Sequence, residues 1–183
     1  MKKNIIISIG YLLVFFIGMI SGILLRQSQS TWTSIQKCLV HNDSKVEDNG
    51  WDEDFKLVKI KSSIDNNIQK AYFFKSDANQ KRPLIVSLHT WSGDYKQRDE
   101  LAELCKLKNL NYIHPNFRGP NWTKKACCSK FALSDIEDAI SFAVENSNVD
   151  TSKIFVIGVS GGGYATLSSF MRLEHDIEKF SAW

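Results

Sequence analysis

The clearest chemical signature in the sequence lies at residues 158–162, which read Gly-Val-Ser-Gly-Gly and match the pattern GxSxG. They follow an apolar run at 154–157 and precede a segment of helical character. In hydrolases this pattern forms a sharp strand-to-helix turn that exposes the serine as a nucleophile. Ser160 is therefore the candidate catalytic nucleophile. Gly158 and Gly162 are the small neighbours that allow an adjacent chain segment to come close.

Two backbone N–H groups are candidates for stabilising the oxyanion that forms when a nucleophile attacks a carbonyl. Gly161 follows Ser160 at the positive end of the expected helix, so its N–H is the first candidate donor. The second donor is expected from the loop after the third strand, where residues 89–94 read His-Thr-Trp-Ser-Gly-Asp. Trp91 is our candidate in this loop, with Thr90 and Ser92 as alternatives one residue away.

The histidines do not complete a catalytic triad in the sequence. His89 and His114 stand at strand ends before the serine, and we expect structural roles for both, because the acid and base of this fold follow the serine. His175 and Asp176 follow Ser160, but we expect them near the far end of its helix, about 20 Å away. The nucleophile thus lacks its acid and base, and we expect an inactive fragment of a longer hydrolase.

The elements that must position the serine are indicated by hydrophobic patterning. Apolar and polar residues alternate over 55–60 and 68–74 around a turn signal at 65–67, which predicts an antiparallel β-hairpin. Later apolar runs alternate with helical periodicity, which predicts parallel strands with helices on both faces. We expect these strands at 84–88, 112–113 and 154–157, another starting near Phe180, and helices at 97–108 and 132–147.

Three blocks give a more specific resemblance. Residues 116–119 read Asn-Phe-Arg-Gly, residues 135–140 read Asp-Ile-Glu-Asp-Ala-Ile, and residues 158–164 read Gly-Val-Ser-Gly-Gly-Gly-Tyr. Their order and spacing resemble the N-[YF]-R-G loop, the D-x-x-D-A helix and the GxSxGGY elbow of the prolyl oligopeptidase family. The resemblance spans roughly residues 51–183 and implies the N-terminal half of an α/β-hydrolase fold. It also implies a serine hydrolase that cleaves peptide or ester bonds through an acyl-enzyme on Ser160.

Departures from this family leave two alternatives open. Residues 89–91 read His-Thr-Trp where the family often has His-Gly-Gly, and the short stalk before the domain is not expected to form a β-propeller. Because a propeller restricts access to small peptides in this family, a carboxylesterase of the same fold is the first alternative. The missing acid and base make a non-catalytic truncated or pseudo-hydrolase the second.

The N-terminal segment predicts a membrane anchor. No charged residue occurs from Ile5 to Leu25, and this length reaches roughly 30 Å as a helix, the thickness of a bilayer core. The apolar region of a signal peptide has only about 7 to 15 residues, so we expect a retained helix instead of a cleaved one. Lys2 and Lys3 precede the segment and predict a cytoplasmic N-terminus, with the rest of the chain outside.

These features divide the chain into three regions. Residues 1–26 are expected to form a cytoplasmic tip and transmembrane anchor, 27–50 a polar stalk, and 51–183 a partial hydrolase domain. Within the anchor, Gly18 and Gly22 form a GxxxG pattern that is compatible with helix dimerisation. Glycine is common in membrane helices, however, and lipid-facing glycines without a partner explain the pattern better than a dimer does.

Composition and charge exclude other classes of protein. The chain has 43% apolar and 23% charged residues, which is ordinary for a globular domain. It has 23 basic and 20 acidic residues, and three of the basic ones, Lys2, Lys3 and Arg26, flank the apolar N-terminal segment. The formal charges of the remaining chain therefore balance, and no nucleic-acid partner is expected. Neither a GxxxxGK[ST] loop nor a GxGxxG motif with an acidic partner occurs, so no nucleotide cofactor is expected.

The four cysteines are Cys38, Cys105, Cys127 and Cys128, and none has CxxC spacing or an accompanying HxxxH pair, so no metal site is expected. In an oxidising space outside the cytoplasm, disulfides would persist. A bond between the adjacent Cys127 and Cys128 would be strained, so we expect one of them to pair with Cys38 or Cys105. Alternatively, Cys105 has helical spacing with nearby leucines and is simply a small buried hydrophobe.

Overall fold

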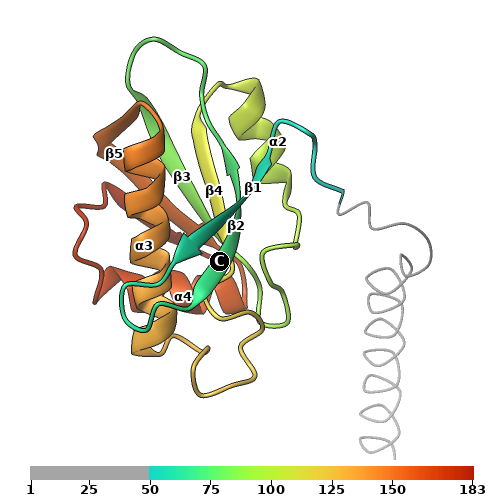
Figure 1. The fold of residues 1–183 in the computed structure, drawn as a ribbon, viewed down its shortest axis with the longest axis vertical. Coiled ribbons are helices and arrows are strands. Elements are labelled where there is room, and N and C mark those ends of the chain that lie inside the picture. The colour runs from blue at the N-terminus through green and yellow to red at the C-terminus, as the bar shows by residue number, and fades with distance from the viewer. Residues whose placement is uncertain (1–49) are drawn as a thin grey trace, which may run out of the picture. The chain divides into compact units, whose positions relative to one another are not determined.

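The computed structural model describes residues 50–183. The predicted anchor, its glycine pair and the stalk up to residue 49 lie outside these residues. Within the described part of the chain, no helix has the length and apolar character needed to cross a membrane. The described residues form one mixed six-stranded sheet with helices packed against it (Figure 1).

The sheet has the spatial order β1-β2-β4-β3-β5-β6. Strand β2 is antiparallel to both β1 and β4, whereas β4, β3, β5 and β6 run parallel to one another. The strands are β1 (Lys56–Lys61), β2 (Ile68–Phe74), β3 (Arg82–Leu88), β4 (Asn111–Pro115), β5 (Val149–Gly158) and β6 (Lys179–Ala182). The helices are α2 (Glu100–Leu107), α3 (Lys130–Asn146) and α4 (Gly161–Phe170).

The predicted antiparallel hairpin is confirmed as β1 and β2. Its turn is stabilised locally, because the N–H of Asn67 donates to Asp65 Oδ1 at 3.1 Å and the N–H of Ser62 donates to the carbonyl of Asn67 at 2.8 Å. Asn66 has φ 61°, and asparagine tolerates this left-handed conformation better than most residues. The Asp-Asn-Asn sequence therefore specifies both the position and the geometry of the turn.

The predicted parallel strands are also confirmed, although β4 and β5 are longer than their apolar runs. The strand expected near Phe180 is present as β6, which pairs with the end of β5. Helices α2 and α3 each begin directly after a residue whose side chain caps the helix. Asp99 accepts a hydrogen bond from Ala102 N at the start of α2, and Ser129 accepts from Ala132 N at the start of α3. As a result, α2 begins three residues later than expected and α3 begins two residues earlier.

The core has two parts, one on each face of the sheet. Along β3, Val86 packs in a cluster with residues of α3 and α4, whereas its neighbour Ile85 packs in a second cluster with residues of α2. Successive residues of a strand point to opposite faces, so this alternation shows helices on both faces, as predicted. In Figure 1, α3 crosses one face of the sheet while α2 lies at the other side of β4.

The predicted disulfide between Cys105 and one of the adjacent cysteines is wrong. Cys105, Cys127 and Cys128 are all free. Cys105 belongs to the cluster on the α2 face and Cys128 to the cluster on the opposite face, so the sheet separates them. Cys105 is the small buried hydrophobe of the alternative interpretation, and burial raises the pKa of its thiol to about 12. A pairing with Cys38 lies outside the described residues.

Candidate active site

Ser160 occupies a sharp turn between β5 and α4. Its backbone has φ 54° and ψ −116°, a combination that L-residues rarely adopt, and the residue is exposed to solvent. The turn is held by Trp183, the residue after β6, because Ser160 N donates to the carbonyl of Trp183 at 2.6 Å and Trp183 N donates to the carbonyl of Gly158 at 3.0 Å. The predicted strand-to-helix turn is therefore present, with Ser160 at its apex.

The two predicted elbow glycines lie where main-chain segments come into direct contact. A Cβ atom at Gly158 would fall 2.2 Å from the carbonyl oxygen of Gly162. A Cβ atom at Gly162 would fall 2.2 Å from the carbonyl oxygen of Leu88, at the end of β3. Real Cβ atoms do not approach other atoms this closely, so the tight packing of α4 on the strand ends requires glycine at both positions.

Trp91 and Gly161, the two predicted oxyanion donors, are neighbours in space. A Cβ atom at Gly161 would fall 2.3 Å from the backbone nitrogen of Trp91. Within residues 50–183, neither of these two N–H groups has a hydrogen-bond acceptor. The alternative donor Thr90 is already engaged, since its N–H donates to Gln97 Oε1 at 3.0 Å. The fold thus brings two unpaired N–H groups together beside Ser160.

The loop that carries Trp91 is fixed by the buried side chain of His89. The ring nitrogens of His89 lie 2.9 Å from the carbonyl oxygen of Thr90 and 2.8 Å from that of Asn116. The ring stacks on Phe117 with centroids 3.8 Å apart. Burial lowers the pKa of His89, which favours the neutral ring. His89 therefore joins the loops after β3 and β4, in agreement with the structural role expected for it.

Asn121 gives this loop a second support that no motif in the sequence indicates. Its N–H donates to the carbonyl of Trp91 at 2.8 Å, and its Oδ1 accepts from Cys127 N at 2.8 Å. Asn121 is buried, and its Nδ2 has no hydrogen-bond partner among the described residues. The segment between β4 and α3 thus holds the main chain of Trp91 through its carbonyl group, and the N–H group of Trp91 stays free.

Arg118 anchors the loop after β4 through a buried ionic network. Its Nε donates to Asp135 Oδ2 at 2.6 Å, its Nη1 to Asp65 Oδ2 at 2.8 Å, and its Nη2 to Ser62 Oγ at 2.9 Å. The hydrogen bond from Arg118 lowers the pKa of Asp65 to about 2. For Asp135, burial outweighs the same partner and raises the pKa. Two of the blocks that suggested the family resemblance therefore meet at one ion pair that joins α3 to the loop.

The other two described histidines lie in separate environments. His114 is fully buried, with Nε2 3.3 Å from the carbonyl oxygen of Asp94 and Nδ1 4.0 Å from Asp99 Oδ2. Burial lowers its pKa to about 4. The packed role expected for His114 fits this environment.

The predicted position of His175 is wrong, because α4 ends at Phe170 and His175 lies in the segment between α4 and β6. Its backbone N–H donates to Glu137 Oε1 on α3 at 2.8 Å, and its Nδ1 contacts the same oxygen. Each of the three histidines in residues 50–183 thus has partners other than Ser160. Within the same range, no three His, Cys, Asp or Glu side chains are grouped so that they could hold a metal ion.

Comparison with known proteins identifies the fold but not a sequence family. No family model matches the sequence, and no curated protein sequence matches it. Among solved structures, a thermostable esterase matches 64% of this chain and 37% of its own, with 20% identity and a TM-score of 0.53. The uncomplexed acylaminoacyl peptidase of Pyrococcus horikoshii matches 75% of this chain and 23% of its own, with 20% identity and a TM-score of 0.56.

A third structure, DcsB in complex with its substrate analogue, matches 64% of this chain and 41% of its own, with 21% identity and a TM-score of 0.52. This chain therefore spans less than half the length of each of these three proteins. At these identities the likeness shows the fold alone: the described residues form part of an α/β-hydrolase fold, which peptidases and esterases share.

Proposed function

We propose that this chain carries the nucleophile of a membrane-anchored serine hydrolase of prolyl oligopeptidase type, which cleaves peptide or ester bonds. The observation that carries the proposal is the placement of Ser160, exposed on a strained turn beside the unpaired N–H groups of Gly161 and Trp91. A turn strained in this way, with donors already in place, is the arrangement that acyl transfer requires. Likeness to a peptidase and an esterase supports the same chemistry.

In this proposal Ser160 Oγ attacks the carbonyl carbon of the substrate while a general base accepts its proton. The carbonyl electron pair moves to the oxygen, where the N–H groups of Gly161 and Trp91 stabilise the charge. Collapse of this intermediate expels the amine or alcohol, which takes the proton from the base, and leaves an acyl group on Ser160. Water then releases the acid by the same steps. The base and its acid partner come from residues outside the described part of the chain.

A carboxylesterase of the same fold is the second candidate. The thermostable esterase and the acylaminoacyl peptidase match this chain at the same 20% identity, so the likeness favours neither reaction. The side chain of Trp91 also stands beside the proposed oxyanion site, where the peptidase family often has glycine. The remaining alternative is a non-catalytic relative, and it is favoured by the absence of any described histidine that contacts Ser160.

Labelling with a fluorophosphonate tests the catalytic proposal. We expect the protein isolated from its native membrane to be labelled on Ser160, because the probe reacts only with an activated serine. The Ser160→Ala variant should not be labelled. Ser152→Ala, which changes an exposed serine on the preceding strand β5, should be labelled like the wild type. Absence of labelling in the native protein would favour the non-catalytic relative. Hydrolysis of peptide amides and of aryl esters by the labelled protein then separates peptidase from esterase.

We also propose that residues 5–25 anchor the protein, with the N-terminus in the cytoplasm and the domain outside. The uncharged run and the preceding Lys2 and Lys3 support this orientation. Extraction of membranes at alkaline pH should leave the protein in the membrane pellet, and protease added to intact cells should digest the domain. Release of the protein into the supernatant without detergent would contradict the anchor.

A further inference from the structure

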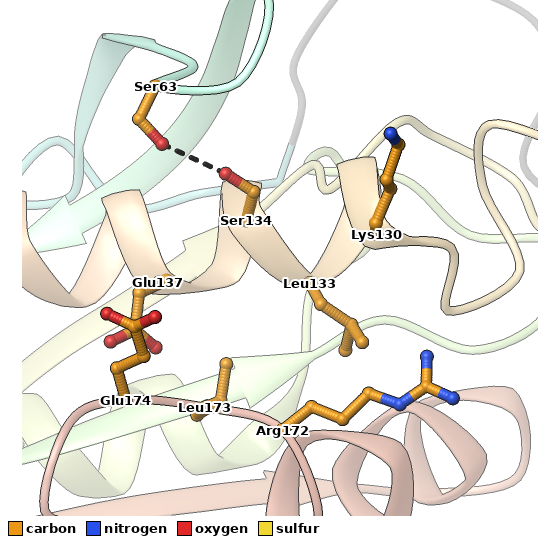
Figure 2. A pocket seen from close by; sticks show the side chains of 8 residues that line it. All are labelled: Ser63, Lys130, Leu133, Ser134, Glu137, Arg172, Leu173 and Glu174. Carbon is orange, nitrogen blue, oxygen red and sulfur yellow. Dashed lines mark hydrogen bonds between the residues drawn. The ribbon is translucent and has the colours of Figure 1, made fainter.

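A cavity separate from Ser160 lies between α3, the turn of the β1–β2 hairpin and the segment after α4 (Figure 2). Its volume is about 330 Å³, which falls within the range of small-molecule sites. Ser63 comes from the hairpin turn, Leu133 and Glu137 from α3, and Leu173 from the segment after α4. Three parts of the chain that are distant in sequence thus enclose a space large enough for a small ligand.

The cavity is lined by opposite charges that do not pair with each other. Lys130 and Arg172 bring two cations, and Glu137 and Glu174 bring two carboxylates. In Figure 2 Glu137 and Glu174 are on one side of the view, whereas Lys130 and Arg172 are on the other. Within residues 50–183, Lys130, Arg172 and Glu174 form no ion pair. The cavity therefore has an anionic end and a cationic end.

Glu137 is held in place while part of its carboxylate stays unsatisfied. Its Oε1 accepts a hydrogen bond from His175 N at 2.8 Å and also contacts His175 Nδ1, which orients the group. Its Oε2 is shielded from water and has no hydrogen-bond partner among the described residues. The His175 contacts thus fix the Glu137 carboxylate, which contributes a negative charge to the wall of the cavity.

The wall between the two charged ends is apolar. Leu133 and Leu173 face the cavity, and Leu133 is itself buried against the core. On the hairpin side, the Oγ atoms of Ser63 and Ser134 are hydrogen-bonded to each other at 2.9 Å, and Figure 2 shows this contact between the hairpin turn and α3. Together these groups suit a ligand with separated positive and negative ends and an apolar middle.

We propose that this cavity binds a small zwitterion with an apolar side chain, either an α-amino acid or a short peptide with free termini. The ammonium group of the ligand meets the carboxylates of Glu137 and Glu174, and its carboxylate meets Lys130 and Arg172. The apolar side chain packs on Leu133 and Leu173. This site is independent of the chemistry proposed for Ser160.

Isothermal titration calorimetry on the full-length chain in detergent micelles tests the proposal with leucine and leucyl-leucine as probes. We expect at least one of them to bind, and their relative affinities distinguish a free amino acid from a peptide. The N-acetyl and C-amide forms of the better probe each lack one charge and should bind about tenfold more weakly or worse. No binding of either probe at millimolar concentration, or equal binding of the capped forms, would overturn the proposal.

Arg172 and Glu174 are exposed, so their substitution should leave the fold intact. The Arg172→Gln variant should bind the probe with a free carboxylate no more tightly than its C-amide form. The Glu174→Gln variant should bind the probe with a free amine no more tightly than its N-acetyl form. Lys59→Gln, an exposed lysine on β1, is the matched control and should bind like the wild type. Ser160→Ala should also keep full affinity. If Ser160→Ala abolished binding, the probes would occupy the candidate active site and the separate cavity would be refuted.

Discussion

The backbone nitrogen of Trp91 lies so close to Gly161 that a single methyl group at Gly161 would fall 2.3 Å from it. The loop after β3 and the first turn of α4 are thus in main-chain contact, and this contact places two unpaired N–H groups beside Ser160. A side chain that moves can relieve an overlap at low cost, but here the clashing atoms belong to the backbone. The geometry of the candidate oxyanion site is therefore sensitive to the smallest substitution at Gly161.

Gly161→Ala should lower the free energy of unfolding by about 1–3 kcal/mol, because the added Cβ overpacks the contact with Trp91. Fluorophosphonate labelling of Ser160 should fall as well, since one of the two donors is displaced. Chemical denaturation and labelling of the same preparation measure both effects. Leu167→Ala, on an exposed part of the same helix, should change stability by only about 0.5 kcal/mol. If Gly161→Ala kept the stability and labelling of the wild type, the loop that carries Trp91 could move away from α4 at little cost.

Arg118→Ala should destabilise the protein by about 3–5 kcal/mol, because it leaves the fully buried carboxylate of Asp135 without its partner. Arg98→Ala removes an arginine whose ion pair with Glu103 is exposed, and it should cost at most about 1 kcal/mol. Urea denaturation of the two variants provides the comparison. Similar losses in both would mean that the network of Arg118 does not hold the loop after β4.

The stability of the protein should decrease as the pH falls from 6.5 toward 4, because burial lowers the pKa of His114 from 6.5 to about 4. In this window the unfolded chain binds a proton that the folded chain does not, so the slope reaches about 1.4 kcal/mol per pH unit for one proton. His89, whose pKa is also lowered, adds to the effect. His114→Gln should reduce the slope, as measured by denaturation at several pH values. An unchanged slope would exclude His114 as a source.

A second loss of stability is expected at lower pH from Asp65. Arg118 lowers the pKa of this carboxylate from 3.8 to about 2, so its stabilising effect is complete above about pH 4 and disappears as the pH falls toward 2. Asp150 has a similarly lowered pKa, owing to its hydrogen bonds with Ser152 and Lys153. Acid titration of Asp65→Asn should therefore be flatter than that of the wild type below pH 4, while Asp150→Asn separates the two contributions. Identical acid transitions in all three proteins would contradict the assignment.

Local signals in the sequence predicted most of the sheet. The turn at 65–67 could be predicted because asparagine and aspartate form it through their own side chains. The pattern around Ser160 could be predicted because the strand, the glycines and the helix are contiguous. Helix starts were less accurate, since the cap Asp99 lies inside the range expected for its helix and the cap Ser129 lies before the range expected for the other.

Long-range contacts account for what the sequence did not predict. The Arg118 network joins residues separated by 53 and 17 positions, and no periodic pattern reveals such a pairing. Asn121 supports Trp91 through a backbone hydrogen bond that any residue other than proline could make. The early end of α4 has a tertiary cause, since the chain must turn back so that Glu178 N can bond to the carbonyl of Ile154 and β6 can follow.

The hydrogen bonds between Trp183 and the turn at Ser160 also affect the order of events during folding. Because the N–H of Ser160 donates to the carbonyl of Trp183, residues that leave the ribosome long after the serine complete its turn. We therefore expect a nascent chain ending soon after α4 to contain Ser160 in a relaxed backbone conformation. The strained backbone conformation of Ser160 would then form only after β6 pairs with β5. Pulsed hydrogen exchange should show the amides of Ser160 and Trp183 becoming protected together.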